Sequence, residues 1–271
     1  KIPRSVQQSI PVKCVYEDGI WLVGRKHSRT WRFSDVNYAA ASEDDRRGIF
    51  LSYGGVLNSL PTDAAAKITI INRRLNPVDF QRTILMKERG DGLDQYRRES
   101  NRILTQRAAE SNNLVQEKYI TLSIPQRKIE ESRAYFRRVD ANLSKSFGRL
   151  DSGARPVSTH DRLRILHDFF RPGEEQYFTF DQSAAVRRGL DFRDLISPDG
   201  LRFRAGHFEM GDKVGRVLFL KDYASYIKDS MISDLSDFSR NLMLSIDILP
   251  IPTDEAVKEI QGRMIVASSA P

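Results

Sequence analysis

The sequence predicts an α+β fold made of two subdomains, each a mixed or mostly antiparallel sheet with helices packed on one face. Short β-branched and aromatic runs alternate with stretches of helical periodicity. The 271-residue length falls where single hydrophobic cores stop growing, at about 250–300 residues. A stretch containing glycine and proline, residues 151–156, is the best candidate for the boundary. We therefore expect a first subdomain over residues 1–152 and a second over residues 153–271.

The strands of the first half are predicted from β-branched and aromatic runs. Residues 1–16 are expected to be an extended lead-in, because its prolines block regular helix. The expected strands are residues 20–23, 30–33, 68–71 and 119–124, with a turn at residues 24–28 joining the first two.

The helices of the first half are predicted from capping and periodicity. Ser42 followed by three acids is typical of a helix N-terminus, and Pro61 ends that helix. Its expected apolar positions are Ile49, Phe50, Tyr53, Val56, Leu57 and Leu60. A second helix is expected over residues 93–110. The clearest helix starts near Ile129, with apolar residues at spacings of three, four and seven as far as Leu150.

The second half repeats a similar order of elements. A helix over residues 160–170 is stopped by proline and glycine, and the last helix starts with a cap and two acids at residues 253–255. Between them we expect a hairpin with strands at residues 203–210 and 214–220, a turn at residues 211–213, a helix at residues 226–237 and a strand at residues 242–248.

The composition limits the classes of function. No run of about 18 apolar residues exists, so nothing is expected to span a bilayer. The single cysteine, Cys14, fits a reducing cytoplasm, and the four scattered histidines make a zinc site improbable. The net charge of +7 is spread thinly along the chain. Such a surface suits nucleic acid or an anionic membrane, or is ordinary surface charge with a mild bias.

A search for catalytic motifs gives negative results. No glycine precedes a lysine, so a phosphate-binding loop is absent, and there is no Gly-x-Ser-x-Gly elbow. The turn Gly90-Asp91-Gly92 is expected to be a tight turn with a helix cap. His167 and Asp168 are neighbours in a helix and are expected to point apart. We therefore expect no catalytic, cofactor-binding or metal-binding residue in this chain.

Two groups of arginines are candidates for a basic interaction surface. Phosphate binding needs such residues on one face, whereas interleaved glutamates favour a solvated, salt-bridged face. The candidate residues are Arg97, Arg98 and Arg102 in one expected helix, and Arg133, Arg137 and Arg138 in another.

Several strings in a fixed order resemble a known family. Together they cover the chain from about Val6 to Arg263, and they are similar to the N-terminal region of VirB-four-type conjugal transfer ATPases. These are type IV secretion proteins encoded by conjugative elements of Gram-positive bacteria. The strings are residues 6–11 (VQQSIP), 16–20 (YEDGI), 71–75 (INRRL), 90–99 (GDGLDQYRRE), 166–175 (LHDFFRPGEE) and 249–256 (LPIPTDEA).

The resemblance implies a longer protein with a C-terminal RecA-like motor, where ATP and magnesium would bind. For this chain it implies a non-catalytic role: docking the motor to membrane-embedded channel subunits and helping it to self-associate. The first subdomain would lie on the membrane-channel side, and the second would lead toward the motor. The implied location is cytoplasmic and peripheral, at the inner face of the plasma membrane. The alternative is a nucleic-acid-binding module that contacts transferred DNA or a relaxase complex, and weak contact with DNA or an anionic membrane is compatible with both.

Overall fold

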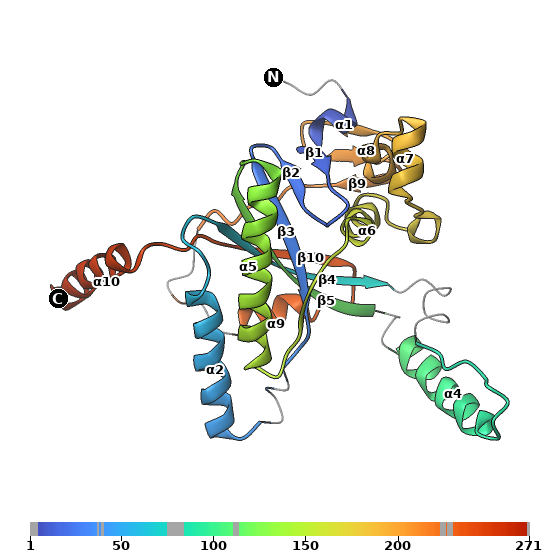
Figure 1. The fold of residues 1–271 in the computed structure, drawn as a ribbon, viewed down its shortest axis with the longest axis horizontal. Helices are drawn as coiled ribbons and strands as arrows, with labels where there is room; N and C mark the ends of the chain where they lie inside the picture. The colour runs from blue at the N-terminus through green and yellow to red at the C-terminus, as the bar shows by residue number, and fades with distance from the viewer. Residues whose placement is uncertain are drawn as a thin grey trace. The chain divides into compact units, whose positions relative to one another are not determined.

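The computed structural model describes residues 5–36, 38, 41–74, 84–110, 114–222, 226 and 230–269. Helices and strands follow one another in mixed order along the chain (Figure 1). The strands are β1 (Val12–Val15), β2 (Trp21–Val23), β3 (Lys26–Phe33), β4 (Ala65–Arg74), β5 (Leu114–Pro125), β6 (Ala154–Pro156), β7 (Leu201–Phe203), β8 (Phe208–Met210), β9 (Lys213–Gly215) and β10 (Leu242–Ile248). The helices are α1 (Val6–Ser9), α2 (Glu43–Asn58), α4 (Asp94–Glu110), α5 (Ile129–Gly148), α6 (Thr159–Phe170), the 3-10 helix η1 (Glu175–Tyr177), α7 (Gln182–Arg188), α8 (Phe192–Ile196), α9 (Met231–Ser236) and α10 (Thr253–Ser269).

The described strands form two sheets, and the predicted α+β class is confirmed. The larger sheet has the order β1-β2-β3-β5-β4-β10, and β6 pairs with β3 beside this path. The smaller sheet has the order β7-β8-β9. The pairs β2–β3, β3–β6, β7–β8 and β8–β9 are antiparallel. The larger sheet therefore takes strands from both halves of the sequence.

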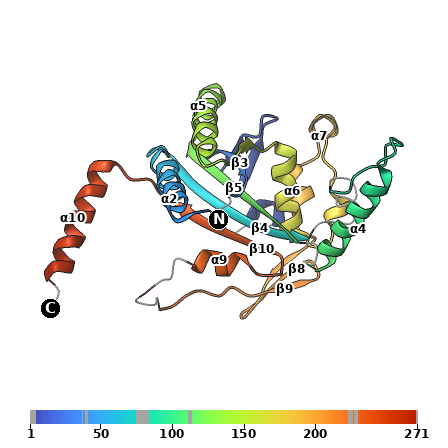
Figure 2. The ribbon, with the colours of Figure 1, turned by 90° about the horizontal axis from the view of Figure 1, so that it is seen from below.

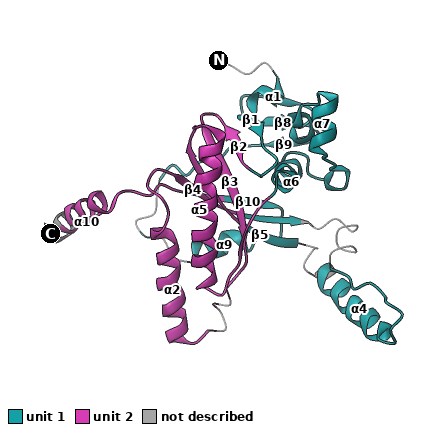
Figure 3. Ribbon diagram, viewed as in Figure 1, with its two compact units in different colours: residues 1–19, 70–118, 158–244 teal, residues 20–69, 119–157, 245–271 magenta. Residues whose placement is uncertain are grey.

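Two compact units are present, each assembled from three segments (Figure 3). Unit 1 comprises residues 1–19, 70–118 and 158–244, and unit 2 comprises residues 20–69, 119–157 and 245–271. This division differs from the predicted boundary at residues 152/153, because β6 lies just beyond that point and pairs with β3 in unit 2. As a statement about independently folding domains, the boundary stays a prediction.

Unit 2 is built around α5 and β3. Trp31 and Phe136 are fully buried, with ring centroids 6.1 Å apart, and the Trp31 indole nitrogen donates to Asp140 at 2.8 Å. The periodicity predicted for α5 is confirmed, because its side chains at spacings of three and four are the buried ones. Helix α2 packs against α5 and places Val56 in the core. Phe50, expected on the apolar face of α2, is 68% exposed, because its position is turned about 120° around the helix from Val56.

Unit 1 has its own core, centred on α6 and α8, where Leu163 and Ile196 are fully buried. Polar side chains of α6 connect it to the chain before β2. Thr159 donates to the carbonyl of Tyr16, and Arg162 donates to the carbonyl of Gly19 at 2.9 Å. These bonds supply partners for carbonyl groups outside the sheet ladder, which burial would otherwise make costly.

Several predicted elements differ from the structure in extent. The lead-in contains helix α1, capped by Ser5, and strand β1, because the proline at position 11 lies between the two elements. The first hairpin turns in two residues, with Val23 paired to Lys26, because Gly24 adopts a φ of 60° that a tight turn requires. Of the strand expected at residues 214–220, only residues up to Gly215 pair, and the helix expected at residues 226–237 is described as α9 alone.

Candidate functional site

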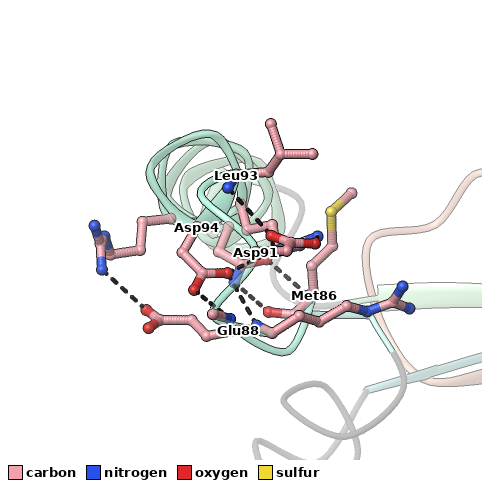
Figure 4. A network of polar contacts seen from close by, with 10 residues as sticks. Met86, Glu88, Asp91, Leu93 and Asp94 are labelled. Atoms are coloured by element: carbon pink, nitrogen blue, oxygen red, sulfur yellow. Dashed lines mark hydrogen bonds and ion pairs between the residues drawn. The ribbon is translucent and has the colours of Figure 1, made fainter.

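Arg97, one of the predicted basic-surface residues, contacts two carboxylates at the start of α4; Figure 4 shows these two acids, Asp91 and Asp94. Its guanidinium donates to Asp91 and Asp94, each at 2.5 Å. Asp94 also accepts from the backbone N–H groups of Arg89 and Gly90, at 2.9 and 2.8 Å. The hydrogen bond from Arg97 lowers the pKa of Asp91 to about 2, and the backbone N–H of Arg89 together with Arg97 lowers the pKa of Asp94 to about 2. The charge of Arg97 is thus neutralised within the chain.

The other two candidates on α4 are also paired. Arg98 lies 3.4 Å from Glu88, and Arg102 lies 2.7 Å from Glu99, three residues before it on the helix. The hydrogen bond from Arg102 lowers the pKa of Glu99. The helix start itself follows the predicted tight turn, since Gly90 and Gly92 both have positive φ and Asp91 accepts from the N–H of Leu93 at 3.1 Å. Arg97, Arg98 and Arg102 are therefore each salt-bridged to an acid of the chain, which leaves little free charge for a phosphate.

The candidates on α5 have different surroundings. Arg137 and Arg138 are exposed, and Arg133 is half-buried. The Arg138 guanidinium lies 5.9 Å from the centroid of the Tyr135 ring, within the range of a cation–π contact. Burial raises the pKa of Tyr135, whose hydroxyl donates to Asp63 at 2.9 Å. Tyr135 thus connects α5 to Asp63 through its hydroxyl and contacts Arg138 through its ring.

A stripe of three cations, Arg138, Lys145 and Arg149, runs along the exposed side of α5 and its C-cap. Spacings of seven and four residues place the three within about 20° of one direction on the helix, and all three are exposed. Within the described part of the chain, none of them has an ion pair with a carboxylate. The acid Glu131 shares this direction but precedes Arg138 by two turns, about 10 Å. We call Arg138, Lys145 and Arg149 the α5 stripe.

The α5 stripe was only partly found from the sequence. Arg138 is among the six predicted residues, whereas Lys145 and Arg149 are not; Arg137 is turned about 100° from Arg138 around the helix. The signal that would have found them is the spacing of basic residues opposite the buried positions. The two arginine groups belong to different units, α4 to unit 1 and α5 to unit 2, so each is a surface of its own.

Two histidines, His27 and His167, form buried contacts that resemble catalytic pairs without an open site. His167 contacts Asp168 at 3.2 Å, so the expectation that these neighbours point apart is wrong; the ring and the carboxylate turn toward each other under Phe178, whose centroid lies 5.1 Å from that of His167. His27 contacts Ser132 at 2.6 Å, and burial lowers the pKa of His27. Side chains so deeply buried, 2% and 0% exposed for His27 and Ser132, offer a substrate no approach.

Two general findings complete the description. Among the described residues, no group of three or more histidine, cysteine, aspartate or glutamate side chains could hold a metal ion. No helix in the same residues is both long enough and apolar enough to cross a membrane. Comparison with models of protein families finds no match, and no curated protein matches the sequence.

Proposed function

We propose that this chain is a non-catalytic docking and assembly module of a conjugative type IV secretion ATPase. It holds the motor against membrane-embedded channel subunits at the inner face of the plasma membrane. Any ATP and magnesium would bind to a motor elsewhere in the protein. The sequence resemblance gives the setting for this proposal, and one exposed helix face gives it a physical basis.

That face belongs to α10. Val257, Ile260 and Met264 are spaced by three and four residues, so they share one side of the helix. They are 46%, 58% and 65% exposed. An apolar stripe on a helix normally packs into a groove, and an amphipathic helix seated in a groove is a common mode of protein recognition. The α10 face therefore supports a protein partner such as a channel subunit.

The test uses the full-length protein and the membrane subunits encoded with it, solubilised in mild detergent. Capture of the protein by tagged subunits should fall at least about tenfold in an Ile260→Ser/Met264→Ser variant, because two anchors lose their apolar contact. Leu190→Ser serves as the control, since Leu190 is exposed to a similar degree, 61%, in unit 1. Equal capture of the two variants, or no capture of the parent protein, would refute the proposal.

A second candidate function is nucleic-acid binding through the α5 stripe. The supporting observation is that Arg138, Lys145 and Arg149 share one exposed face without a carboxylate partner in the described residues. Phosphate backbones attract such a row of cations, and the resulting affinity falls with salt. Titration of a labelled duplex at two salt concentrations tests this candidate, and undetectable binding at low salt would remove it.

A further inference from the structure

The segment after β9 exposes four large apolar side chains in succession. Val217, Leu218, Phe219 and Leu220 are 79%, 84%, 83% and 67% exposed. Single exposed apolar residues are ordinary on protein surfaces, but a contiguous group marks a site of interaction. All four belong to unit 1.

The form of this segment limits what can cover it. From the end of β9, residues 216–222 are drawn out as an extended trace (Figure 2). In extended chain, successive side chains point to opposite sides. Val217 and Phe219 therefore face one way, while Leu218 and Leu220 face the other. A groove or a flat protein surface would cover only one of these two sides, whereas a lipid layer can surround the segment and cover both.

One cation lies on each side of the segment, and the exposed acid Asp222 follows the second. Arg216 precedes the segment and Lys221 follows it, and both are exposed. Arg216 donates to the carbonyl of Gly206 at 3.2 Å, and neither cation has a carboxylate ion pair among the described residues. Residues 201–222 contain five basic and three acidic residues, a balance of +2. One of the acids, Glu209, lies within 3.9 Å of both Arg202 and Arg204.

We propose that residues 216–221 insert into the surface of an anionic lipid bilayer. The four apolar side chains enter the boundary between headgroups and acyl chains, while Arg216 and Lys221 extend to the lipid phosphates. Insertion is shallow, because the backbone of an extended segment needs water or headgroups as hydrogen-bond partners. The inference rests on the proposed function for its membrane setting and adds to it a direct contact with lipid.

The experiment places a tryptophan in the segment of the full chain. The native residues Trp21 and Trp31 are 3% and 0% exposed, so a Phe219→Trp variant adds the one water-exposed indole, and its emission reports transfer into lipid. Emission should shift to the blue on addition of phosphatidylcholine vesicles containing phosphatidylglycerol, and much less with phosphatidylcholine alone. A Val186→Trp variant, at a position that is 76% exposed, should not shift.

Co-sedimentation with the same vesicles gives the second readout. Leu218→Ser/Phe219→Ser should weaken binding by about tenfold or more, since two large apolar side chains leave the lipid. Arg216→Gln/Lys221→Gln should remove most of the preference for anionic vesicles. Unchanged binding of the serine variant, or equal binding of the parent protein to neutral and anionic vesicles, would overturn the inference. So would a blue shift of the Phe219→Trp variant that appears without vesicles when the protein concentration is raised, because it would indicate self-association.

The outcome is separable from that of the docking proposal. Protein-free vesicles contain no channel subunit, and capture by subunits in detergent requires no bilayer. If the parent protein does not bind vesicles but is captured by the channel subunits, the lipid contact is refuted and the docking proposal stands. If the parent protein binds vesicles but is not captured by the channel subunits, docking through α10 is refuted and the lipid contact stands.

Discussion

Neutralising the α5 stripe provides a quantitative test of nucleic-acid binding. The perturbation is the triple variant Arg138→Gln/Lys145→Gln/Arg149→Gln, which removes three positive charges from one exposed face. The three positions span eleven residues, about 16 Å of helix. Duplex DNA carries a charge for about every 1.7 Å of its axis, so all three cations can reach phosphates.

The magnitude follows from counterion release. Each phosphate contact contributes about 0.9 to the slope of log affinity against log salt for a duplex. Losing three contacts should reduce that slope by about 2.7. Between 50 and 200 mM salt, a fourfold change, the advantage of the parent protein over the triple variant should shrink by about 40-fold.

The assay is fluorescence anisotropy with a labelled duplex at a series of salt concentrations. The matched control is Arg98→Gln/Arg102→Gln on α4, whose arginines are already paired with Glu88 and Glu99. The control should leave the slope nearly unchanged. Equal slopes for the triple variant and the parent protein would show that the stripe is ordinary surface charge. Urea unfolding guards against misfolding, since Lys145 and Arg149 also stabilise the helix C-terminus by about 0.3–1 kcal/mol each.

Three further predictions concern stability. Phe136→Ala, at a fully buried ring in the unit 2 core, should lower the free energy of unfolding by about 3–5 kcal/mol in urea titrations. A loss below about 1 kcal/mol would contradict this packing. Burial lowers the pKa of His27, so the free energy of unfolding should be highest above pH 6.5, the ordinary pKa of histidine, and should fall as the pH drops from 6.5 toward the pKa of the folded state. His27→Gln should make the free energy of unfolding depend less on pH, measured by urea unfolding between about pH 5 and 8. The same pH dependence in the variant and the parent protein would refute this prediction. Gly215→Ala places a methyl group 2.2 Å from the ring of Phe208 and should lower the melting temperature, an effect that Phe208→Leu should reduce; additive losses in the double variant would show that the ring is not the obstacle.

Local signals predicted the elements that depend on local physics. The strand at residues 242–248 and the start of α2 after Ser42 match the structure, because apolar strand patterns and side-chain caps act over a few residues. The pairing of β6 with β3 did not follow from the sequence, since the partners Trp31 and Pro156 are 125 positions apart. The apolar residues 217–220 predicted a paired strand, but β9 ends at Gly215. An apolar run indicates that the side chains favour an apolar environment, and it does not identify which partner provides that environment.

The arginines show the same limit for sites. Spacing along a helix identifies Arg102 and Glu99 as partners, because both lie on α4. It does not reveal that Arg97 and Arg98 meet Asp91 and Glu88, which precede the helix and reach it only through the Gly90–Gly92 turn. The free charge of a helix face is therefore a property of its neighbours as much as of its own residues. In this chain, the candidate surface for binding phosphates is therefore on α5 and not on α4. The slopes of log affinity against log salt for the α5 triple variant and the α4 double variant test this difference directly.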